Sequence, residues 1–343
     1  MQGSNKRRLA WLALPLSLSL LAAACGDDDD DDAGTDEGGE EATEDLSGSV
    51  NISGSSTVEP ISSLVAEEFS LENEGVTISV EGPGTGDGFE AFCAGETDIS
   101  DASRPIDEEE VAACEAGGIE YVELQIGFDG IAVLTSANNE SVECLSFADL
   151  YALVGPEGQD VTNWSGASAV AGELGSSTEF PDAELTIVGP GTESGTYDSF
   201  IEIALADIAG ERGQADDATR SDYESSDNDN LIIENIGASD TSLGWVGFAF
   251  AEAASDTVRE IEVSADADGE CVAPTAETIA DESYPLSRSL YIYVNAANAE
   301  SNPAVAAYVD LYLSDLGGFV EDAGYVALPD DLAEATTAAW DGR

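Results

Sequence analysis

Short apolar runs alternate with helical repeats along the chain from about residue 47 onward. Residues 50–52, 76–80 and 185–188 are rich in β-branched side chains, which favours strands. Each run is followed by apolar positions three or four residues apart, which predicts helices with one buried face. These positions are Ile61, Leu64, Val65 and Phe69, then Phe89 and Phe92, and finally Tyr197, Phe200, Ile201, Ala204 and Leu205. Strands that alternate with helices predict an α/β fold.

Glycine and hydroxyl side chains fill the turn between each of these strands and its helix. The turns are GSST at residues 54–57, GPGTGDG at 82–88 and GPGTESGT at 189–196. At such a junction unpaired backbone N–H groups and the positive end of the helix dipole face outward, and glycine allows a ligand to approach closely. One such turn is more often ordinary helix capping. Three of them in one chain predict a shared site for a tetrahedral oxyanion.

Two further segments, residues 130–135 and 289–294, are predicted to be buried strands separated by about half the chain. We expect them to be the two crossings between a pair of lobes. Residues 243–248 form another candidate strand. The apolar spacing near the C-terminus predicts a helix whose buried face consists of Val305, Tyr308, Val309, Tyr312 and Leu316.

The N-terminus has the pattern of an export signal. Three cations ending at Arg8 precede an apolar run over residues 9–24, which finishes with small residues before Cys25. This pattern predicts a secretory signal peptide at residues 1–24. A cysteine directly after it resembles a bacterial lipoprotein signal, in which Cys25 carries the lipid. An ordinary signal followed by an incidental cysteine is the alternative.

An acidic segment follows Cys25. In residues 26–46, 12 of the 21 side chains are acidic and none is aromatic. Such a segment cannot bury enough apolar surface to fold, and its charges repel one another. We therefore interpret residues 25–46 as a lipid-bearing tether that holds the folded part away from a membrane. Metal binding by the run of six aspartates is the less favoured alternative.

The charge balance excludes several classes of function. The chain of 343 residues has 72 acidic and 9 basic residues and no histidine, a formal charge of −63. Without imidazole, Ser-His-Asp and Cys-His nucleophiles and zinc sites with histidine ligands are excluded. Nucleic-acid binding is not expected, because it needs clustered cations. Once residues 1–24 are removed, six arginines stand against 72 carboxylates, a charge of −66 that favours solubility at high ionic strength.

Five motifs are similar to those of the phosphate-binding subunits of bacterial phosphate ABC importers, the PstS type. They are GSSTVEP at 54–60, GPGTGDGFEAFCAGETDISDASRPI at 82–106, IGFDGIAVLT at 126–135, GTESGTYDSF at 191–200 and YPLSRSLYIYVN at 284–295. The resemblance covers nearly the whole folded part, to about residue 328. It implies an α/β, two-lobed periplasmic-binding-protein fold of type II, in which the chain crosses the hinge twice and phosphate lies between the lobes.

The same resemblance implies how the chain is divided and what it does. One lobe is expected at residues 47–128 and 287–343, and the other at 129–286. The expected function is an extracytoplasmic, lipid-anchored monomer that delivers inorganic phosphate to the membrane subunits of an ABC permease. It would not be an enzyme, and no cofactor or metal is expected.

The resemblance also assigns roles to individual residues. One group matches the first helix start of the family's site, a second group the hydroxyl after the second strand, and a third the turn that covers phosphate from the other lobe. The residues are Ser56, Thr57 and the backbone N–H of Val58 in the first group, Thr85 in the second, and Ser194, Gly195 and Thr196 in the third.

Two positions depart from the family's best-known pattern. Ser103 stands where an aspartate usually accepts the ligand's proton, and Pro190 stands where an arginine is usual. Ser103 and Arg104 together resemble a subgroup in which a Ser-Arg pair follows the strand. Arg104 is therefore expected to replace the missing donor, because a guanidinium binds an oxyanion with two hydrogen bonds. The alternative is a structural ion pair of Arg104 with Asp101 or Asp107.

Three further residues are weaker candidates for the site. Arg220 is a second possible donor, but it is equally well placed to pair with Asp222. Asp87 and Asp101 are the nearest candidates to accept the ligand's proton, although a solvated or capping role is favoured for both.

Four cysteines besides Cys25 are expected to form disulfides in an exported chain. The lobe assignment favours Cys93 with Cys114 and Cys144 with Cys271, because each pair then lies within one lobe. Other functions also stay open from the sequence. The same site could bind sulfate, molybdate or arsenate, and a secreted hydrolase or a surface sensor could use the same fold.

Overall fold

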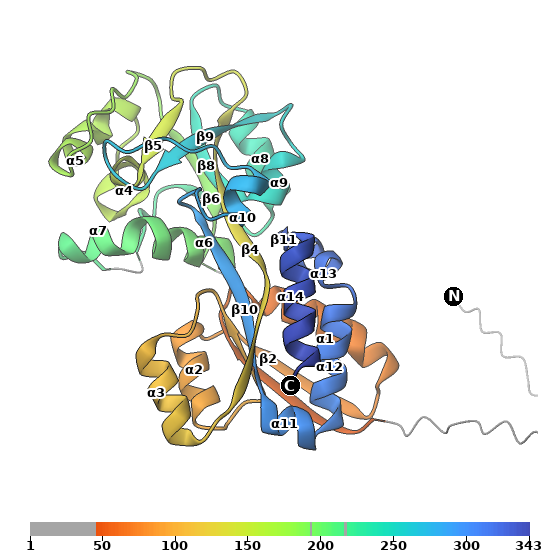
Figure 1. The fold of residues 1–343 in the computed structure, drawn as a ribbon. Coiled ribbons are helices and arrows are strands. Elements are labelled where there is room, and N and C mark those ends of the chain that lie inside the picture. Colours follow the sequence, from red (N-terminus) through yellow and green to blue (C-terminus); the bar gives the residue numbers. More distant parts are fainter. Residues whose placement is uncertain (1–45, 193, 216–217) are drawn as a thin grey trace, which may run out of the picture. The chain divides into compact units, whose positions relative to one another are not determined.

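The computed structural model describes residues 46–192, 194–215 and 218–343. The expected signal peptide, Cys25 and nearly all of the expected tether lie outside these residues. Figure 1 shows that the described chain is mixed α/β and forms two lobes joined by two long strands. The predicted α/β architecture with two lobes and two crossings is therefore confirmed.

The first lobe is built on three parallel strands. They are β1 (Gly48–Gly54), β2 (Val76–Glu81) and β3 (Ile99–Ala102), in the order β2-β1-β3. Helices follow the strands in turn: α1 (Glu59–Glu72), α2 (Thr85–Cys93) and α3 (Glu108–Gly117). Because the strands run parallel, their carboxyl ends and the helix N-termini meet at one edge of the sheet. The first two predicted oxyanion junctions lie at this edge.

Strands β4 (Tyr121–Ser136) and β10 (Ser287–Asn295) run between the lobes, antiparallel to each other (Figure 1). Strand β4 pairs with β10 as far as Gly130 and with a strand of the second lobe from Ile131 onward. The segments predicted as crossings lie inside these two strands. We still propose that the lobe boundaries lie between residues 128 and 129 and between residues 286 and 287.

The second lobe has its own parallel strands, β6 (Thr186–Pro190), β7 (Glu224–Ser226) and β8 (Ser242–Gly247). A small parallel pair, β5 (Cys144–Ser146) and β9 (Val258–Ser264), joins the same sheet through β4. The second lobe's α-helices are α4 (Phe147–Val154), α5 (Ser168–Glu173), α6 (Gly195–Phe200), α7 (Ala206–Glu211), α8 (Asp229–Gly237), α9 (Phe248–Glu252) and α10 (Ala276–Ala280). Short 3-10 helices span Pro156–Gly158 and Trp164–Ala167, and a π-helix, η3 (Ile201–Leu205), connects α6 to α7.

The C-terminal segment returns to the first lobe. It contains α11 (Ala296–Ser301), α12 (Pro303–Ser314), α13 (Leu316–Asp322), β11 (Val326–Ala327) and α14 (Asp330–Asp341). The predicted helix face is fully buried in α12, where Val305, Tyr308 and Tyr312 are 0% exposed. The extension of that face to Leu316 is wrong, because Asp315 leaves helical geometry and Leu316 begins α13.

Each lobe has its own apolar core. One cluster gathers around Ile52, Ile292 and Tyr308, and the other around Trp164, Phe200 and Trp245. The two expected disulfides, Cys93–Cys114 and Cys144–Cys271, are present. No helix in residues 46–343 that the structure describes is both long and apolar enough to cross a membrane.

Candidate functional site

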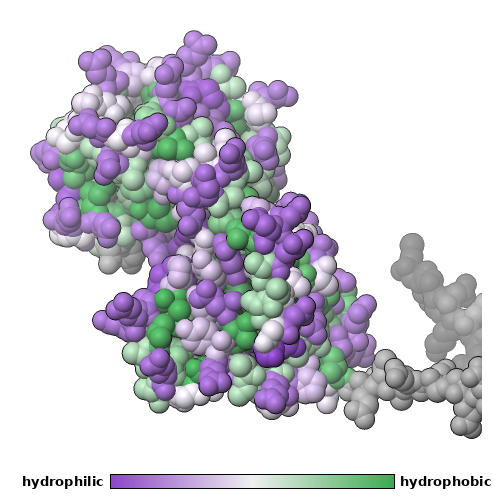
Figure 2. Space-filling view, in the orientation of Figure 1, coloured by the Kyte–Doolittle hydropathy of each residue, from purple (hydrophilic) through white to green (hydrophobic). Residues whose placement is uncertain are grey.

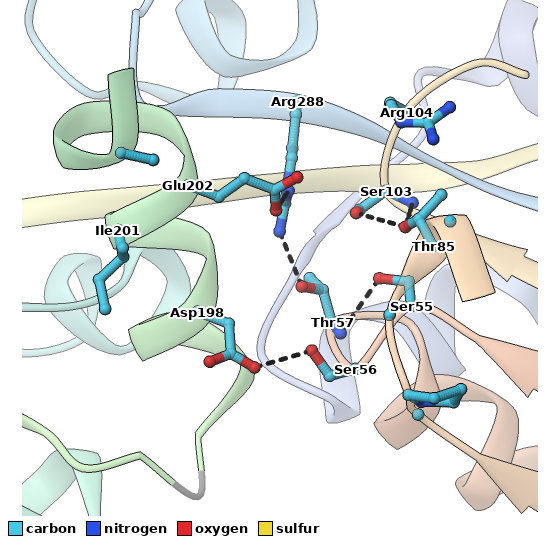
Figure 3. Close-up of a pocket in the computed structure, with 15 residues that line it drawn as sticks. Ser55, Ser56, Thr57, Thr85, Ser103, Arg104, Asp198, Ile201, Glu202 and Arg288 are labelled. Carbon is cyan, nitrogen blue, oxygen red and sulfur yellow. Dashed lines mark hydrogen bonds and ion pairs between the residues drawn. The ribbon is translucent and has the colours of Figure 1, made fainter. Parts of the chain in front are cut away.

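A cleft of about 430 Å³ lies between the two lobes and is lined by residues from both (Figure 3). The first lobe contributes the turns after β1 and β2 and the end of β3. The second lobe contributes α6, the π-helix η3 and the first residue of α7, and β10 contributes one side chain. The lining residues are Ser55, Ser56, Thr57, Gly82, Pro83, Gly84, Thr85, Gly86, Ser103, Arg104, Asp198, Ile201, Glu202, Ala206 and Arg288.

The first junction turns tightly from β1 into α1. The Ser55 hydroxyl accepts a hydrogen bond from the Thr57 N–H at 3.2 Å, and the Ser55 carbonyl accepts one from the Val58 N–H at 3.1 Å. Ser56 and Thr57 line the cleft, whereas Val58 is fully buried behind them. In the structure described, the Val58 N–H is thus engaged within its own turn.

The second junction and the end of β3 come together at one wall. The Thr85 and Ser103 hydroxyls lie 3.0 Å apart, and the Ser103 N–H donates to Thr85 Oγ1 at 3.2 Å (Figure 3). Gly84 has a φ of 117°, a left-handed value that favours glycine, and no side chain caps α2. The first N–H groups of a helix have no partner inside it. This wall therefore presents hydroxyl and amide donors to the cleft.

The third junction, before α6, touches the first junction instead of the cleft wall. A Cβ atom at Gly195 would lie only 3.0 Å from the Ser56 carbonyl oxygen. Ser194 caps α6 by accepting a hydrogen bond from the Thr196 N–H at 3.2 Å. All three predicted junctions thus gather at one place, but α6, η3 and the start of α7 supply the second lobe's cleft residues.

Hydrogen bonds between side chains of the first junction and of α6 join the lobes across the cleft. Ser56 Oγ donates to Asp198 Oδ2 at 3.0 Å, and the Thr57 and Ser199 hydroxyls are 3.0 Å apart. Asp198 and Glu202 are the carboxylates among the cleft-lining residues described. Neither residue is among the acceptors expected from the sequence.

Arg104 lies at the cleft, but its guanidinium is held by its own lobe. Both Nη atoms donate to the Glu110 carboxylate, at 2.8 and 2.7 Å, and Asp107 lies 3.9 Å away. This ion pair raises the pKa of Arg104 further. The alternative, a structural ion pair of Arg104, is therefore observed, with Glu110 as the main partner. In Figure 3 the Arg104 guanidinium points away from Arg288.

Arg288 is a cleft residue that sequence reasoning missed. It lies on β10, directly opposite Asp129 on β4, and its guanidinium donates to Glu202 at 2.6 Å and to Thr57 Oγ1 at 2.8 Å. A signal was present, because Arg288 is a lone cation directly before a predicted buried strand, and YPLSRSLYIYVN contains it. A buried cation needs a partner, and Asp129 in the neighbouring crossing is that partner at 3.5 Å.

The remaining candidates lie away from the cleft lining. Arg220 is 4% exposed. It donates to Asp222 at 2.6 and 2.8 Å and to two backbone carbonyls, so the pairing with Asp222, which was the alternative to a role as donor, is the one observed. Asp87 is exposed in the first turn of α2. Asp101 is fully buried and accepts a hydrogen bond from Ser62 Oγ at 2.9 Å.

Burial raises the pKa of two carboxyl groups, those of Asp101 and Asp129. Desolvation raises the pKa of Asp101 to about 7, although the Ser62 hydrogen bond lowers it. Desolvation also raises the pKa of Asp129, against the opposing effect of Arg288. Arg288 and Asp129 face each other beside the cleft, with Nε and Oδ2 3.5 Å apart.

Comparison with known proteins agrees with this geometry. A family model described as the PBP superfamily domain matches residues 39–315. Protein SphX of Synechocystis sp. is 38% identical over 285 residues, 82% of this chain and 79% of that protein. The phosphate-binding protein PstS of Staphylococcus epidermidis is 34% identical over 316 residues, 92% of this chain and 87% of that protein.

A solved structure shares both sequence and fold with this chain. It is the crystal structure of a possible phosphate binding protein from Planctomyces limnophilus, with a TM-score of 0.77 and 34% identity over 87% of this chain and 99% of that one. The resemblance found in the motifs is thereby confirmed. The chain belongs to the PBP superfamily and, within it, to the family of PstS-type phosphate-binding proteins.

Proposed function

We propose that this protein is the extracytoplasmic phosphate-binding component of an ABC importer. The cleft binds inorganic phosphate, and lobe closure presents the loaded protein to the permease. The names of its relatives support this function, since the S. epidermidis protein is a phosphate-binding protein. Nothing is chemically converted in this function.

One observation carries the proposal. The ends of β1, β2 and β3 bring Ser56, Thr57, Thr85 and Ser103 to one cleft, and the turn of Gly195 lies against them from the other lobe. Hydroxyl and amide donors at helix N-termini suit a tetrahedral oxyanion. The donors come from separate strand–helix junctions, as the sequence pattern led us to expect.

The binding residues follow from this arrangement. Ser56, Thr57, Thr85 and Ser103 donate from the first lobe, and Arg104 stands beside them at the rim. On lobe closure, the turn formed by Ser194, Gly195 and Thr196 and the N–H of Val58 complete the set. Each hydrogen bond to the anion contributes about 0.5–3 kcal/mol net, so a set of neutral donors is sufficient for tight binding.

In this proposal the N-terminal segment determines where the protein is located. A signal peptide at residues 1–24 exports the chain, lipid on Cys25 anchors it to the cell membrane, and residues 25–46 act as tether for a monomer. Mass spectrometry of the membrane fraction tests this part. A diacylated N-terminal Cys25 is expected, and a mature protein that begins elsewhere without lipid would contradict it.

Another oxyanion is the main alternative, because sulfate and molybdate have the same shape as phosphate. Asp198 at the cleft favours a protonated ligand such as phosphate or arsenate, since a carboxylate repels a fully ionised anion but can accept a proton from a protonated one. Catalysis is not part of the proposal. Turnover of a phosphate ester by the purified protein would revise that point.

Calorimetric titration of the purified protein tests the function. Phosphate is expected to bind with 1:1 stoichiometry, arsenate to compete with it, and sulfate and molybdate to bind far more weakly. Tighter binding of sulfate or molybdate than of phosphate would refute the assignment. Absence of heat for all four anions, in protein shown to be folded by circular dichroism, would do so as well.

A further inference from the structure

Arg288 faces two carboxylates of very different exposure. Asp129 is its cross-strand neighbour on β4, with Nε and Oδ2 3.5 Å apart, and the side chain of Asp129 is 2% exposed. Glu202 comes from the other lobe, accepts from Nη1 at 2.6 Å, and is 60% exposed. Asp129 is thus fixed in the hinge, whereas Glu202 can swing into solvent without disturbing any packed core.

The backbone around Glu202 favours such a movement. Glu202 lies in the π-helix η3, between α6 and α7, and Figure 3 shows its carboxylate beside Arg288 in the cleft. π-Helical turns are rare and occur frequently at functional sites. The wider turn directs Glu202 toward β10, while Ile201 and Leu205 of the same turn are buried in the core.

The guanidinium of Arg288 is not fully satisfied in this arrangement. Within the described chain, Arg288 Nε and Asp129 Oδ2 are both buried without a hydrogen-bond partner. Nη2 meanwhile donates to the hydroxyls of Thr57 and Ser199, at 2.8 and 2.5 Å. A buried donor left without a partner is costly, and an anion in the cleft is well placed to improve these bonds.

We propose that Arg288 is the charged donor to the bound oxyanion, and that Glu202 is an internal competitor that the anion displaces from it. The inference rests on the proposed binding of phosphate in this cleft. Glu202 occupies Nη1 of Arg288, where an anion in the cleft would bind, and the two negative charges repel each other, so Glu202 leaves when the ligand enters. The carboxylate thereby sets the threshold of ligand concentration at which the site fills.

Arg104 is less suited to this role. Its partner Glu110 is 16% exposed and belongs to the same lobe. The same carboxylate also accepts from the Asp107 N–H at 2.9 Å and so completes the capping box of α3. Release of Arg104 would therefore disturb a helix terminus, whereas release of Arg288 moves one exposed side chain.

Two substitutions test the proposal by calorimetry with phosphate and with sulfate. Glu202→Gln removes the competitor and is expected to raise the affinity for both anions about three- to fivefold, the effect of a partly exposed ion pair. Arg288→Gln removes the donor and is expected to lower phosphate affinity by about ten- to a hundredfold. Because Glu202 is largely exposed, the first variant will fold even if the second does not.

An ion pair in the second lobe, in which Arg212 holds both Glu157 and Glu173, provides the control. Glu173 is 65% exposed and accepts from Arg212 at 2.9 Å, outside the cleft lining. Glu173→Gln and Arg212→Gln make the same charge changes and are expected to leave phosphate affinity within about 1.5-fold, because screened distant charges contribute little.

The outcomes separate the two proposals. Unchanged or weaker phosphate binding in Glu202→Gln overturns the competitor role, and a loss confined to phosphate would identify Glu202 as an acceptor of the ligand's proton instead. Phosphate affinity of Arg288→Gln within about threefold of the wild type overturns the donor role. If the wild-type protein binds no phosphate at all, the proposed function itself fails, and this inference falls with it.

Discussion

The carboxyl group of Asp101 lies fully buried at the end of β3, next to Ser62. Its pKa in the folded protein is about 7, raised from 3.8, with burial as the main cause. Between pH 4 and 7 the folded protein therefore keeps a proton that the unfolded chain releases. The contribution of Asp101 to the free energy of unfolding decreases as pH rises through this window and is constant above it.

Asp101→Asn should remove this pH dependence. The amide oxygen still accepts from Ser62, and the side chain no longer ionises. At pH 4 the variant and the wild type should have nearly equal free energies of unfolding, and by pH 8 the variant should be more stable by up to about 4 kcal/mol. Urea unfolding at pH 4, 6 and 8 measures the difference. A difference that stays constant with pH would show that Asp101 does not titrate in this range.

Thr85 offers a test of the neutral donors. Its hydroxyl lies 3.0 Å from that of Ser103 and faces the cleft. Thr85→Val keeps the shape and removes the hydroxyl, so phosphate affinity should fall about three- to tenfold, the value of one hydrogen bond. Calorimetry measures it, with Thr337→Val on exposed α14 as the control. Equal affinities in Thr85→Val and the wild type would exclude Thr85 from the site.

Sequence reasoning found the hydroxyl residues of the cleft and Arg104, but not Asp198, Glu202 and Arg288. Ser56, Thr57 and Thr85 could be predicted because glycine-rich turns between a strand and a helix are local patterns in the sequence. Arg288 and Glu202 meet only through the tertiary fold, since they are 86 positions apart and belong to different lobes. No spacing rule connects such residues, and the missing partner of a buried cation was the available clue.

Helix α2 sits directly on β1, and this contact fixes the second junction. A Cβ atom at Gly88 would lie 2.4 Å from the Cα atom of Gly54, which is backbone and cannot turn away. Glycine is therefore required at this position by close packing. The contact holds the N-terminus of α2, and with it Thr85, at the edge where β1 and β3 end.

Gly88→Ala should destabilise the protein by about 1–3 kcal/mol through overpacking and should weaken phosphate binding through displacement of α2. Gly86→Ala in the same helix is the control for stability, because no atom lies within 4 Å of its added Cβ. That variant should be as stable as the wild type or slightly more so. Urea unfolding compares them, and equal stability of Gly88→Ala and the wild type would disprove the close contact.

The elements that follow periodic patterns were predictable, and the irregular ones were not. Strands β1, β2 and β6 and helices α1 and α12 follow their apolar spacing. Strand β3 was missed because its buried residues include Ser100 and Asp101, which read as polar in the sequence. The π-helix η3 was also missed, because the apolar positions from Phe200 to Leu205 fit an ordinary α-helix equally well.

The charge of the protein opposes the charge of its proposed ligand. A formal charge of −63 repels phosphate at long range, and Figure 2 shows hydrophilic side chains over much of one face of both lobes. Binding therefore depends on hydrogen-bond donors in the cleft and on salt, which screens the repulsion from the acidic side chains elsewhere. The screening length is about 8 Å at 0.15 M salt and about 3 Å at 1 M.

Added NaCl should accelerate phosphate association, because screening removes the long-range repulsion. We expect the association rate constant to rise severalfold, up to roughly tenfold, between 0.05 and 1 M NaCl. Stopped-flow measurement of intrinsic tryptophan fluorescence gives the rate, with Na2SO4 avoided as a possible competitor. A rate that falls as NaCl rises would mean that the cleft attracts phosphate at long range despite the acidic surface.

A crystal structure of the protein grown with saturating phosphate would locate the ligand. The account predicts one tetrahedral anion in the cleft between the lobes, within hydrogen-bond distance of Ser56, Thr85 and Arg288, with Glu202 turned toward solvent. An empty cleft at saturating phosphate, or an anion bound only at another place on the protein, would contradict the account.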